Sequence, residues 1–572
     1  MTGFDEMVDW LVVGSGAGSM ASALVMRDTG KSVVILEKTA FVGGTTAKSG
    51  GVMWIPANRF MLADGESDSA EAAMAYLDAT QDEHPAPGTS SAKRRAYVTQ
   101  APRAIDFLVD KGVALQRGAT FWPDYYDELP GGCKTSRTVV AKPFDRKELG
   151  PWRDKLRKGF AEFNVTLVEG MEAQGHRRTN KASGKMLLRI IGRTLRDKLL
   201  GRQYTTAGAA LQGRMLKAAL AAGVDIRLNA PARQIIIADD AATGVETVRD
   251  GKPWRIGARL GVLINAGGFS QNQAMRDRYI PGTSVQWSQT PEGDTGDMHQ
   301  ELERIGGHLA QMDQLVGYQM TPAPGWDQTY VAPGAQSMTG KPHAILVDQR
   351  GQRYMNEGGS YELYCETMRK RNALVPAIPS WAIVDRNYVE LYAIAGKFID
   401  KKIPDGWIES GYLHTADTIA DLATGIKVDP ATLTATVARW NGFVAKGADE
   451  DFQRGARAYD NCGFVGDPFS DQSALGAIDK GPFYAVPVVP GDVSTYGGVV
   501  TDARGRVVKA DGQVIAGLYA TGTTTASVMG NVYVGAGASI GPSLVFGYIA
   551  ARHAAGLDNQ PLSVKRAGRD RR

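Results

Sequence analysis

The chain has 572 residues, of which 43% are hydrophobic and 22% are charged, and its formal net charge at pH 7 is +4. This composition is typical of a globular protein with two or more domains, and so small a net charge gives no indication of nucleic-acid binding. The three cysteines, Cys133, Cys365 and Cys462, are far apart, so neither a disulfide framework nor a metal site is expected.

The N-terminal residues are acidic and run directly into an apolar stretch, without the basic and apolar regions of a signal peptide. The sequence also has no uninterrupted run of about 18 apolar residues, the length that a membrane-spanning helix needs. We therefore expect a cytoplasmic protein without a transmembrane helix.

The first 37 residues have the pattern of a nucleotide-binding βαβ unit. An apolar strand at 10–13 is followed by a glycine-rich turn at 14–19, an apolar helix, and a second strand at 32–36 that ends at Glu37. Glycines in such a turn let the backbone approach a pyrophosphate, and the acidic residue binds a ribose hydroxyl. Ser19 occupies the third glycine position, so slightly wider packing of the helix on the strand is expected.

A second glycine-rich loop at 43–51 can donate backbone N–H groups to a phosphate or to a flavin edge. Two phosphate sites suit FAD, which is long enough to need both. Further strands end in glycines at 262–268 and 517–522, so we expect an insertion between them. The predicted fold class is α/β, a Rossmann-like FAD-binding domain with an inserted α+β catalytic domain. The expected boundaries are 1–275 with 485–556 for the first domain, 276–484 for the second, and 557–572 for a disordered basic tail.

The segment 146–203 is rich in lysine and arginine. A basic amphipathic helix can lie on an anionic membrane surface, but a helix with a solvated charged face has the same pattern. Peripheral membrane association is therefore left open. The basic residues that recur at helical spacing among apolar neighbours are Lys185, Arg189, Arg193 and Arg196.

Near the C-terminus, Tyr533 precedes Gly537 by four residues in a glycine-rich segment. A phenol and a backbone N–H can both donate to one carbonyl oxygen, which polarises a ketone and stabilises its enolate. Tyrosines offer such hydroxyls to an apolar substrate without a buried charge.

These motifs resemble those of the 3-ketosteroid Δ1-dehydrogenases, flavoproteins related to fumarate reductase. The resemblance runs from about residue 8 to residue 556, and it implies non-covalently bound FAD, a 3-oxosteroid substrate and an external electron acceptor such as a quinone. The implied reaction is oxidation of the C1–C2 bond. The most specific motifs are PDYYDELPGG at 123–132, RYMNEGGSY at 353–361 and YVGAGASIGP at 533–542.

The resemblance also implies roles for individual residues. Tyr361 removes the C2 proton, Tyr125 assists it, and Tyr533 with Gly537 binds the C3 oxygen. The residues expected to contact the substrate are Trp122, Tyr126 and Tyr496. The residues expected to bind FAD are Gly14, Ser15, Gly16, Ala17, Gly18, Glu37, Lys38, Gly43, Gly44, Thr45, Ser49, Gly50, Gly51, Ala266, Gly267, Gly268, Asp297, Gly522, Ser539 and Ile540.

Three alternatives remain at this point. A related ketosteroid enzyme acts on the C4–C5 bond, and Tyr496, Asn531 and other departures from the family pattern touch the flavin edge and the pocket. A fumarate-reductase-like enzyme needs histidines and arginines for two carboxylates, whereas the segment 494–498 has no histidine. A non-catalytic flavin- or lipid-binding protein would keep the glycines but could lose the tyrosines.

Overall fold

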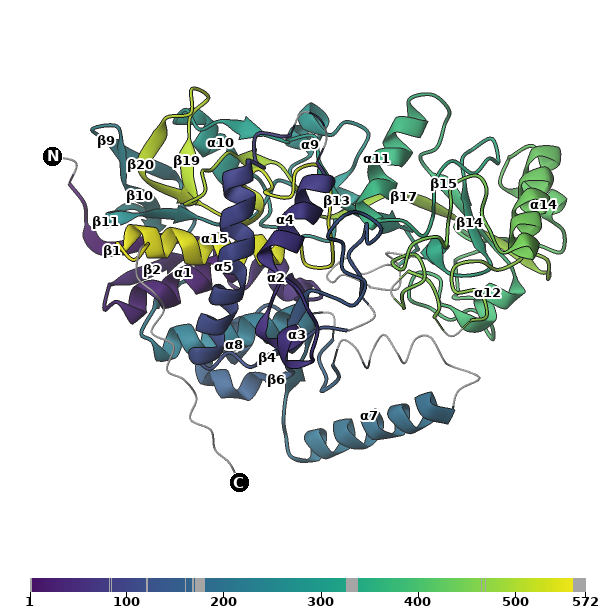
Figure 1. Cartoon of the computed structure of the whole chain (residues 1–572), viewed down its shortest axis with the longest axis horizontal. Coiled ribbons are helices and arrows are strands. Elements are labelled where there is room, and N and C mark those ends of the chain that lie inside the picture. The colour runs from purple at the N-terminus through teal and green to yellow at the C-terminus, as the bar shows by residue number, and fades with distance from the viewer. Residues whose placement is uncertain are drawn as a thin grey trace.

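The computed structural model describes residues 3–81, 83, 85–119, 122–159, 161–166, 169, 181–325, 338–463, 465–468 and 470–558. Two sheets lie at opposite ends of the molecule (Figure 1), and the larger one has eight strands in the order β19-β20-β10-β11-β1-β2-β8, with β9 paired to β10. Its strands are β1 (Glu6–Val13), β2 (Val33–Leu36), β8 (Asp225–Arg227), β9 (Gln234–Ala238), β10 (Ala241–Arg249), β11 (Lys252–Ile264), β19 (Arg506–Val508) and β20 (Val514–Ala520).

The centre of this sheet is parallel, because β2 and β11 both pair with β1 in the same direction, and β8 and β20 extend the two sides. The second half of β1, residues 10–13, is apolar and buried because both of its faces are covered. Trp10 and Val12 pack into the core beneath the helices, whereas Val8, Leu11 and Val13 pack against β10 and a helix that begins at Asp297.

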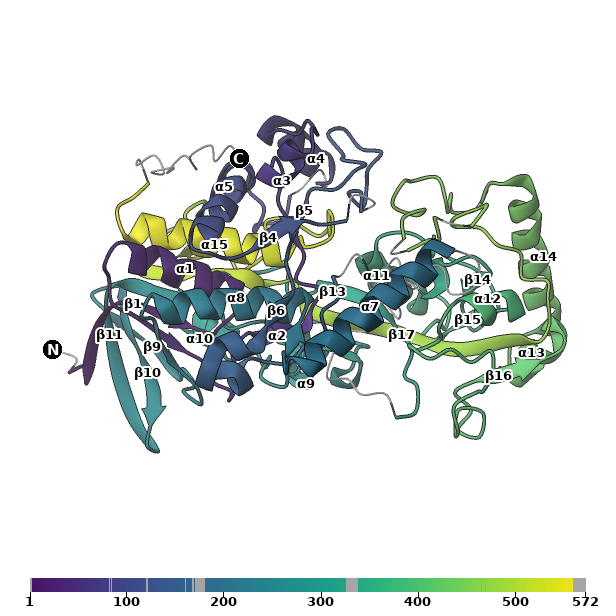
Figure 2. The same ribbon diagram turned by 90° about the horizontal axis from the view of Figure 1, so that it is seen from below.

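Helices cover one face of the large sheet (Figure 2). They are α1 (Ala17–Asp28), α8 (Ala207–Ala221) and α15 (Ile540–Ala554), and α5 (Ser91–Asp110) packs on the outer side of α15. A Cβ atom on Gly18 would lie 2.3 Å from the carbonyl oxygen of Ser543, so glycine is what lets α1 approach α15 closely. Ser19 is fully buried, and its side chain lies 3.0 Å from that of Asn265.

The second sheet is antiparallel and has the order β13-β17-β15-β14, with β16 also paired to β17. Its strands are β13 (Leu315–Met320), β14 (Ala344–Val347), β15 (Ser380–Val384), β16 (His414–Ala416) and β17 (Phe483–Thr495), and its helices are α11 (Tyr361–Asn372), α12 (Arg386–Leu391), α13 (Ile419–Gly425) and α14 (Pro430–Lys446). The expected α/β fold class with an inserted α+β region is thereby confirmed. The boundary expected at residue 485 falls inside β17, which pairs with strands of the second sheet up to Thr495. The rest of the domain division stays a prediction.

The remaining elements are shorter, and several of their strands form separate small sheets. They are α2 (Gly44–Lys48), α3 (Arg59–Ala63), α4 (Ala70–Ala79), α9 (Gln273–Tyr279), α10 (Asp297–Arg304), β3 (Met53–Trp54), β4 (Leu115–Arg117), β5 (Thr138–Ala141), β6 (Phe144–Asp145), β7 (Tyr204–Thr205), β12 (Leu309–Ala310) and β18 (Gly498–Val499). β3, which follows the second glycine-rich loop, pairs with β5.

One helix, α7 (Lys181–Leu199), is set apart from both sheets (Figure 1). Leu188, Leu195 and Leu199 expose 70%, 57% and 88% of their surface. None of the helices in the described part of the chain combines the length and the apolar character needed to cross a bilayer. The tail expected at 557–572 lies almost entirely outside the described residues.

Candidate active site

One large cleft, with about 1870 Å³ of empty space including the part open to solvent, brings together most of the predicted site residues. Ala17, Gly18, Gly43, Gly268, Gly522, Tyr126 and Tyr496 do not belong to its lining. The predicted residues that do line it are Gly14, Ser15, Gly16, Glu37, Lys38, Gly44, Thr45, Ser49, Gly50, Gly51, Trp122, Tyr125, Ala266, Gly267, Asp297, Tyr361, Tyr533, Gly537, Ser539 and Ile540.

Glu37 holds the nucleotide part of the cleft together. One carboxylate oxygen accepts a hydrogen bond of 2.6 Å from the Ser15 hydroxyl, and the other accepts bonds from the backbone N–H and hydroxyl of Thr39 at 2.9 and 2.8 Å. The Ser15 hydroxyl in turn accepts a bond of 2.9 Å from the N–H of Gly43. The two glycine-rich loops are therefore tied to each other through the end of β2.

The shape of the backbone in this part fits FAD. Gly14 has a φ of +94°, and a Cβ atom there would lie 2.1 Å from the carbonyl oxygen of Asn265, so the turn accepts only glycine. The turn before α1 and the first residue of α15, Ile540, both border the cleft. Helix N-termini present free N–H groups and partial positive charge, which favour a pyrophosphate and an electron-rich flavin edge.

Four buried tyrosines form the opposite part of the cleft: Tyr125, Tyr361, Tyr459 and Tyr533. The ring centroid of Tyr361 lies 5.2 Å from that of Tyr533 and 5.5 Å from that of Tyr125. The hydroxyl of Tyr533 lies 3.1 Å from that of Ser539. Three residues more than 150 positions apart in the chain therefore present phenols to one space.

Burial is the main influence on the acidity of these phenols. It raises the pKa of Tyr361 well above its usual value, and the neighbouring phenols of Tyr125 and Tyr533 raise it further. Burial also raises the pKa of Tyr533, although its hydrogen bonds with Ser539 and Tyr361 act in the opposite direction. Near neutral pH, these side chains are therefore protonated and act as hydrogen-bond donors. Formation of an anionic base requires that one of them lose its proton at a cost in free energy.

The backbone of Gly537 requires a glycine. Its φ is +89°, and a Cβ atom would lie 2.4 Å from the carbonyl oxygen of Val52. Its own carbonyl accepts a hydrogen bond of 3.2 Å from the N–H of Trp54. This contact holds the 533–537 segment against β3, with Gly537 on the wall of the cleft.

The position of Tyr125 is set by its neighbour Asp124. This buried carboxylate accepts a bond of 2.7 Å from the Trp54 indole N–H and pairs with Arg137 at 2.6 Å. The backbone N–H of Tyr125 also donates to the carbonyl of Val534 at 3.1 Å. The loop that contains Tyr125 is thus fixed to both β3 and the segment that contains Tyr533.

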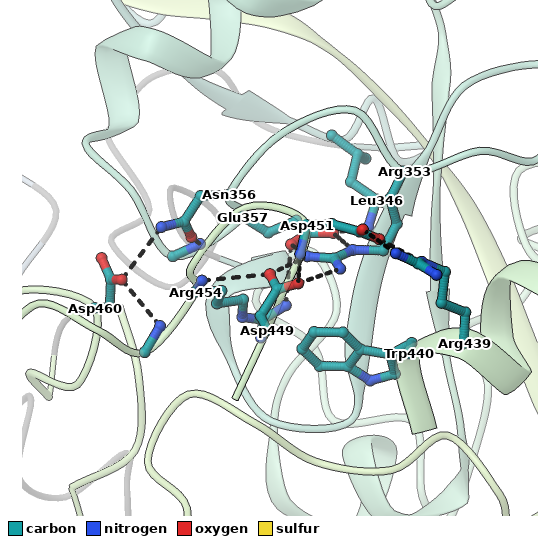
Figure 3. Close-up of polar contacts among 12 residues, drawn as sticks. Leu346, Arg353, Asn356, Glu357, Arg439, Trp440, Asp449, Asp451, Arg454 and Asp460 are labelled. Carbon is teal, nitrogen blue, oxygen red and sulfur yellow. Dashed lines mark hydrogen bonds and ion pairs between the residues drawn. The ribbon is translucent and has the colours of Figure 1, made fainter. Parts of the chain in front are cut away.

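A buried ionic cluster fixes the loop before Tyr361 (Figure 3). The guanidinium of Arg353 pairs with Glu357 at 2.7 Å and with Asp449 at 2.9 Å, and it lies 4.5 Å from the ring centre of Trp440. Both carboxylates are fully buried, so this arginine neutralises charges that solvent does not reach.

The same region positions Tyr459. Asn356 donates a hydrogen bond of 3.2 Å to Asp460, as Figure 3 shows, and this ties the loop before Tyr361 to the loop that contains Tyr459. The N–H of Tyr459 donates to Asp127 at 3.1 Å, and its ring centroid lies 4.1 Å from that of Tyr125. Tyr459 lies in none of the sequence motifs, so no local signal marked it.

Two tyrosines expected to contact substrate lie elsewhere. The hydroxyl of Tyr126 donates to Glu362 at 3.0 Å. The hydroxyl of Tyr496 donates to the carbonyl of Val532 at 2.9 Å, and this residue lines a separate, smaller cavity. The site residues predicted from the sequence also omit several that line the cleft. Besides Tyr459 they include Thr39, Arg157, Asn265, Asp294, Ser494 and Thr523.

Comparison with known proteins identifies the cofactor and the family. Residues 9–540 match the family described as FAD binding domain, so FAD is the cofactor, as the sequence predicted. The 3-oxosteroid 1-dehydrogenase of Mycolicibacterium smegmatis is 36% identical over 96% of this chain and 97% of its own length. The 4-oxocyclohex-2-ene-1-carboxylate 5-dehydrogenase of Sinomonas cyclohexanicum is 33% identical over 98% and 96%.

A solved structure gives the same relationship. The 3-ketosteroid Δ1-dehydrogenase of Sterolibacterium denitrificans, in complex with 1,4-androstadiene-3,17-dione, aligns with a TM-score of 0.89 and 31% identity. The alignment covers 96% of this chain and all of that one.

Proposed function

The chain belongs to the FAD binding domain family as an FAD-dependent dehydrogenase of the 3-ketosteroid dehydrogenase group, and on this basis we propose that it introduces a double bond between C1 and C2 of a 3-oxosteroid. The observation that carries the proposal is the cluster of Tyr125, Tyr361 and Tyr533 beside Gly537 on one wall of the FAD cleft. Every one of these groups is neutral, as binding of an uncharged ketone requires.

In the proposed mechanism, the Tyr533 hydroxyl and the Gly537 N–H donate hydrogen bonds to the C3 oxygen. Both bonds become stronger as the enolate develops, and each such donor typically lowers the barrier by about 3–4 kcal/mol. Tyr361 acts as a phenolate, which a hydrogen bond from Tyr125 stabilises, and it becomes a neutral phenol when it takes the C2 proton. Bound FAD supplies the acceptor for the hydride that leaves C1. The steroid thus loses one proton and one hydride as the double bond forms.

The charges in the cleft disfavour a carboxylate substrate. Among the described residues, the cations on its lining are Lys38 and Arg157, and both lie on the nucleotide side, beside Asp297 and Thr39. His299 is buried, and its burial lowers its pKa to about 4, so it is neutral and faces the carbonyl of Gly497. The carboxylates of a fumarate-like substrate, or of a ring ketone that bears a carboxylate, would therefore find no cation beside the tyrosines in the described part of the lining.

Anaerobic mixing with androst-4-ene-3,17-dione tests the proposal. We expect bleaching of the flavin absorbance and a 1,4-diene product. A 5α-reduced 3-oxosteroid distinguishes the two ketosteroid reactions, because a C4–C5 dehydrogenase would return the 4-ene and a C1–C2 dehydrogenase the 1-ene. Reduction of the flavin by a saturated dicarboxylate such as succinate would contradict the proposal. So would the failure of every 3-oxosteroid to reduce the flavin.

We also propose that α7 binds an anionic membrane surface, from which an apolar steroid and a quinone acceptor could both be drawn. Its exposed leucines lie among Lys185, Arg189 and Arg196, the pattern of an interfacial helix. Co-sedimentation with phosphatidylglycerol vesicles, compared with Leu188→Asp and with neutral vesicles, tests this. Binding that is unchanged by the substitution would contradict it. The cytoplasmic location stays a prediction.

A further inference from the structure

Three of the segments that build the tyrosine cluster meet at one buried carboxylate, that of Glu362. This residue follows Tyr361 in the first turn of α11 and is 7% exposed. One of its oxygens accepts a hydrogen bond of 3.0 Å from the Tyr126 hydroxyl and another of 3.0 Å from the backbone N–H of Tyr533. Its second oxygen accepts a bond from the hydroxyl of Ser360.

The contacts of Glu362 join residues that are distant in sequence. Tyr126 is the neighbour of Tyr125, and Tyr533 is the residue that we assign to the ketone oxygen. A single side chain therefore links the base, the loop that holds its assisting phenol, and the backbone of the ketone donor. Its hydrogen bonds fix where each segment lies relative to the others.

The environment of this carboxylate is unusual for a structural group. The hydrogen-bond donors that the structure records for it are neutral, and burial raises its pKa to about 7. The titratable groups around it in the described part of the chain are Tyr126, Tyr496, Tyr533 and, on α11 itself, Glu366, which raises its pKa further. Arg457 packs on the ring of Tyr126 at 5.3 Å and pairs with Glu128.

Two consequences of ionisation act in the same direction. A hydrogen bond to a carboxylate is roughly twice as strong as one to a neutral oxygen, so the ionised side chain holds Tyr126 and the Tyr533 backbone more firmly. The negative charge of Glu362 also raises the pKa of Tyr533, which keeps that phenol protonated and able to donate. The protonated side chain loses both effects.

We propose that Glu362 is a positioning residue that aligns Tyr361 with the ketone donors Tyr533 and Gly537, and that it does so most effectively when it is ionised. The inference rests on the proposed function, because the alignment matters only if Tyr533 binds the ketone oxygen. It assigns to Glu362 no contact with substrate and no transferred proton.

The test compares wild type with Glu362→Gln, which keeps the size and one acceptor oxygen but cannot ionise. Stopped-flow flavin reduction by a 3-oxosteroid is measured at about pH 6 and about pH 8, on either side of the pKa of about 7. At the higher pH we expect the variant to be slower by about tenfold, the usual effect of weakening hydrogen bonds to a charged group, with KM changed by less than about threefold. At the lower pH, where wild type is also protonated, the two rates should converge to within about threefold.

A second test variant and a control keep the inference falsifiable if Glu362→Gln folds poorly. Tyr126→Phe removes a bond that lowers the pKa of Glu362, so the inflection in the wild-type rate should move to higher pH. Asp385→Asn is the matched control, because this fully buried carboxylate accepts bonds from the backbone N–H groups of Tyr388 and Lys480 in the second sheet region, away from the cleft lining. It should leave the pH dependence of flavin reduction unchanged.

The outcomes separate this inference from the proposed function. An active wild type whose rate ratio to Glu362→Gln is the same at both pH values would overturn the positioning role alone. So would a Tyr126→Phe variant with an unshifted inflection. A wild-type protein whose flavin no 3-oxosteroid reduces would overturn the proposed function and this inference with it.

Discussion

Replacing Tyr533 with phenylalanine removes one hydroxyl and leaves the packing of the ring intact. The side chain is 4% exposed, and its ring centroid lies 5.2 Å from that of Tyr361 and 5.8 Å from that of Tyr125. The hydroxyl lies 3.1 Å from that of Ser539 and also makes a hydrogen bond with Tyr361. The substitution therefore creates no cavity of a size that would disturb the cluster.

The expected effects on binding and on catalysis differ. Deleting one donor to a developing oxyanion usually lowers the rate by about 10²–10³-fold, so flavin reduction by a 3-oxosteroid should slow by that factor. The neutral ketone accepts a weaker hydrogen bond than the enolate, so its dissociation constant should rise much less. Loss of the bonds to Ser539 and Tyr361 should lower the free energy of unfolding by about 1–3 kcal/mol.

Anaerobic stopped-flow measurement of flavin reduction over a range of steroid concentrations separates the two effects. Tyr548→Phe in α15 is the matched control, because this buried tyrosine packs on Phe107 and lies outside the cleft lining. A reduction rate within about threefold of wild type would refute the assignment of Tyr533 to the ketone oxygen, since so small a change is what loss of an ordinary neutral contact produces.

Tyr361→Phe should reduce turnover by at least about 10²-fold while flavin absorbance shows FAD still bound, and a variant that keeps more than about a tenth of wild-type activity would be incompatible with its role as base. Because burial raises the pKa of Tyr361 and the base must be deprotonated, the rate of flavin reduction should keep rising with pH through the alkaline range, and a flat alkaline profile would contradict this. Arg353→Met should leave the buried carboxylate of Asp449 without its cation and Glu357 with only Arg454, at 3.4 Å, and so lower the free energy of unfolding by about 3–5 kcal/mol. Denaturant unfolding measures that loss, and an unchanged midpoint with an unchanged slope would refute it.

Local sequence patterns were enough for the nucleotide part of the molecule. The strand at 10–13, the glycines that follow it and Glu37 lie within one βαβ unit, and their roles depend on contacts between near neighbours in the chain. Gly14 and Gly537 were recognisable for the same reason, because a left-handed φ and a close backbone approach restrict the residue itself. The fold class and FAD followed from these features.

Contacts between distant segments could not be predicted in this way. The motif at 123–132 contains Tyr126, and Tyr496 stands where the chain departs from the family pattern, but only tertiary packing turns one hydroxyl toward Glu362 and the other toward Val532. β17 continues to Thr495 because its partners β13 and β15 lie in the second sheet, and no change in composition marks that point.

The sequence by itself determined the cofactor and the α/β architecture, since each depends on short motifs whose backbone geometry is locally restricted. Its resemblance to a known family predicted roles for three tyrosines, which line one cleft. Only the tertiary structure decided that Tyr459 joins those phenols and that Glu362 connects their segments. The physical reason is that a side chain's partners in a buried cluster are chosen by the packing of whole elements. That packing depends on the summed burial of many residues rather than on the spacing of any few.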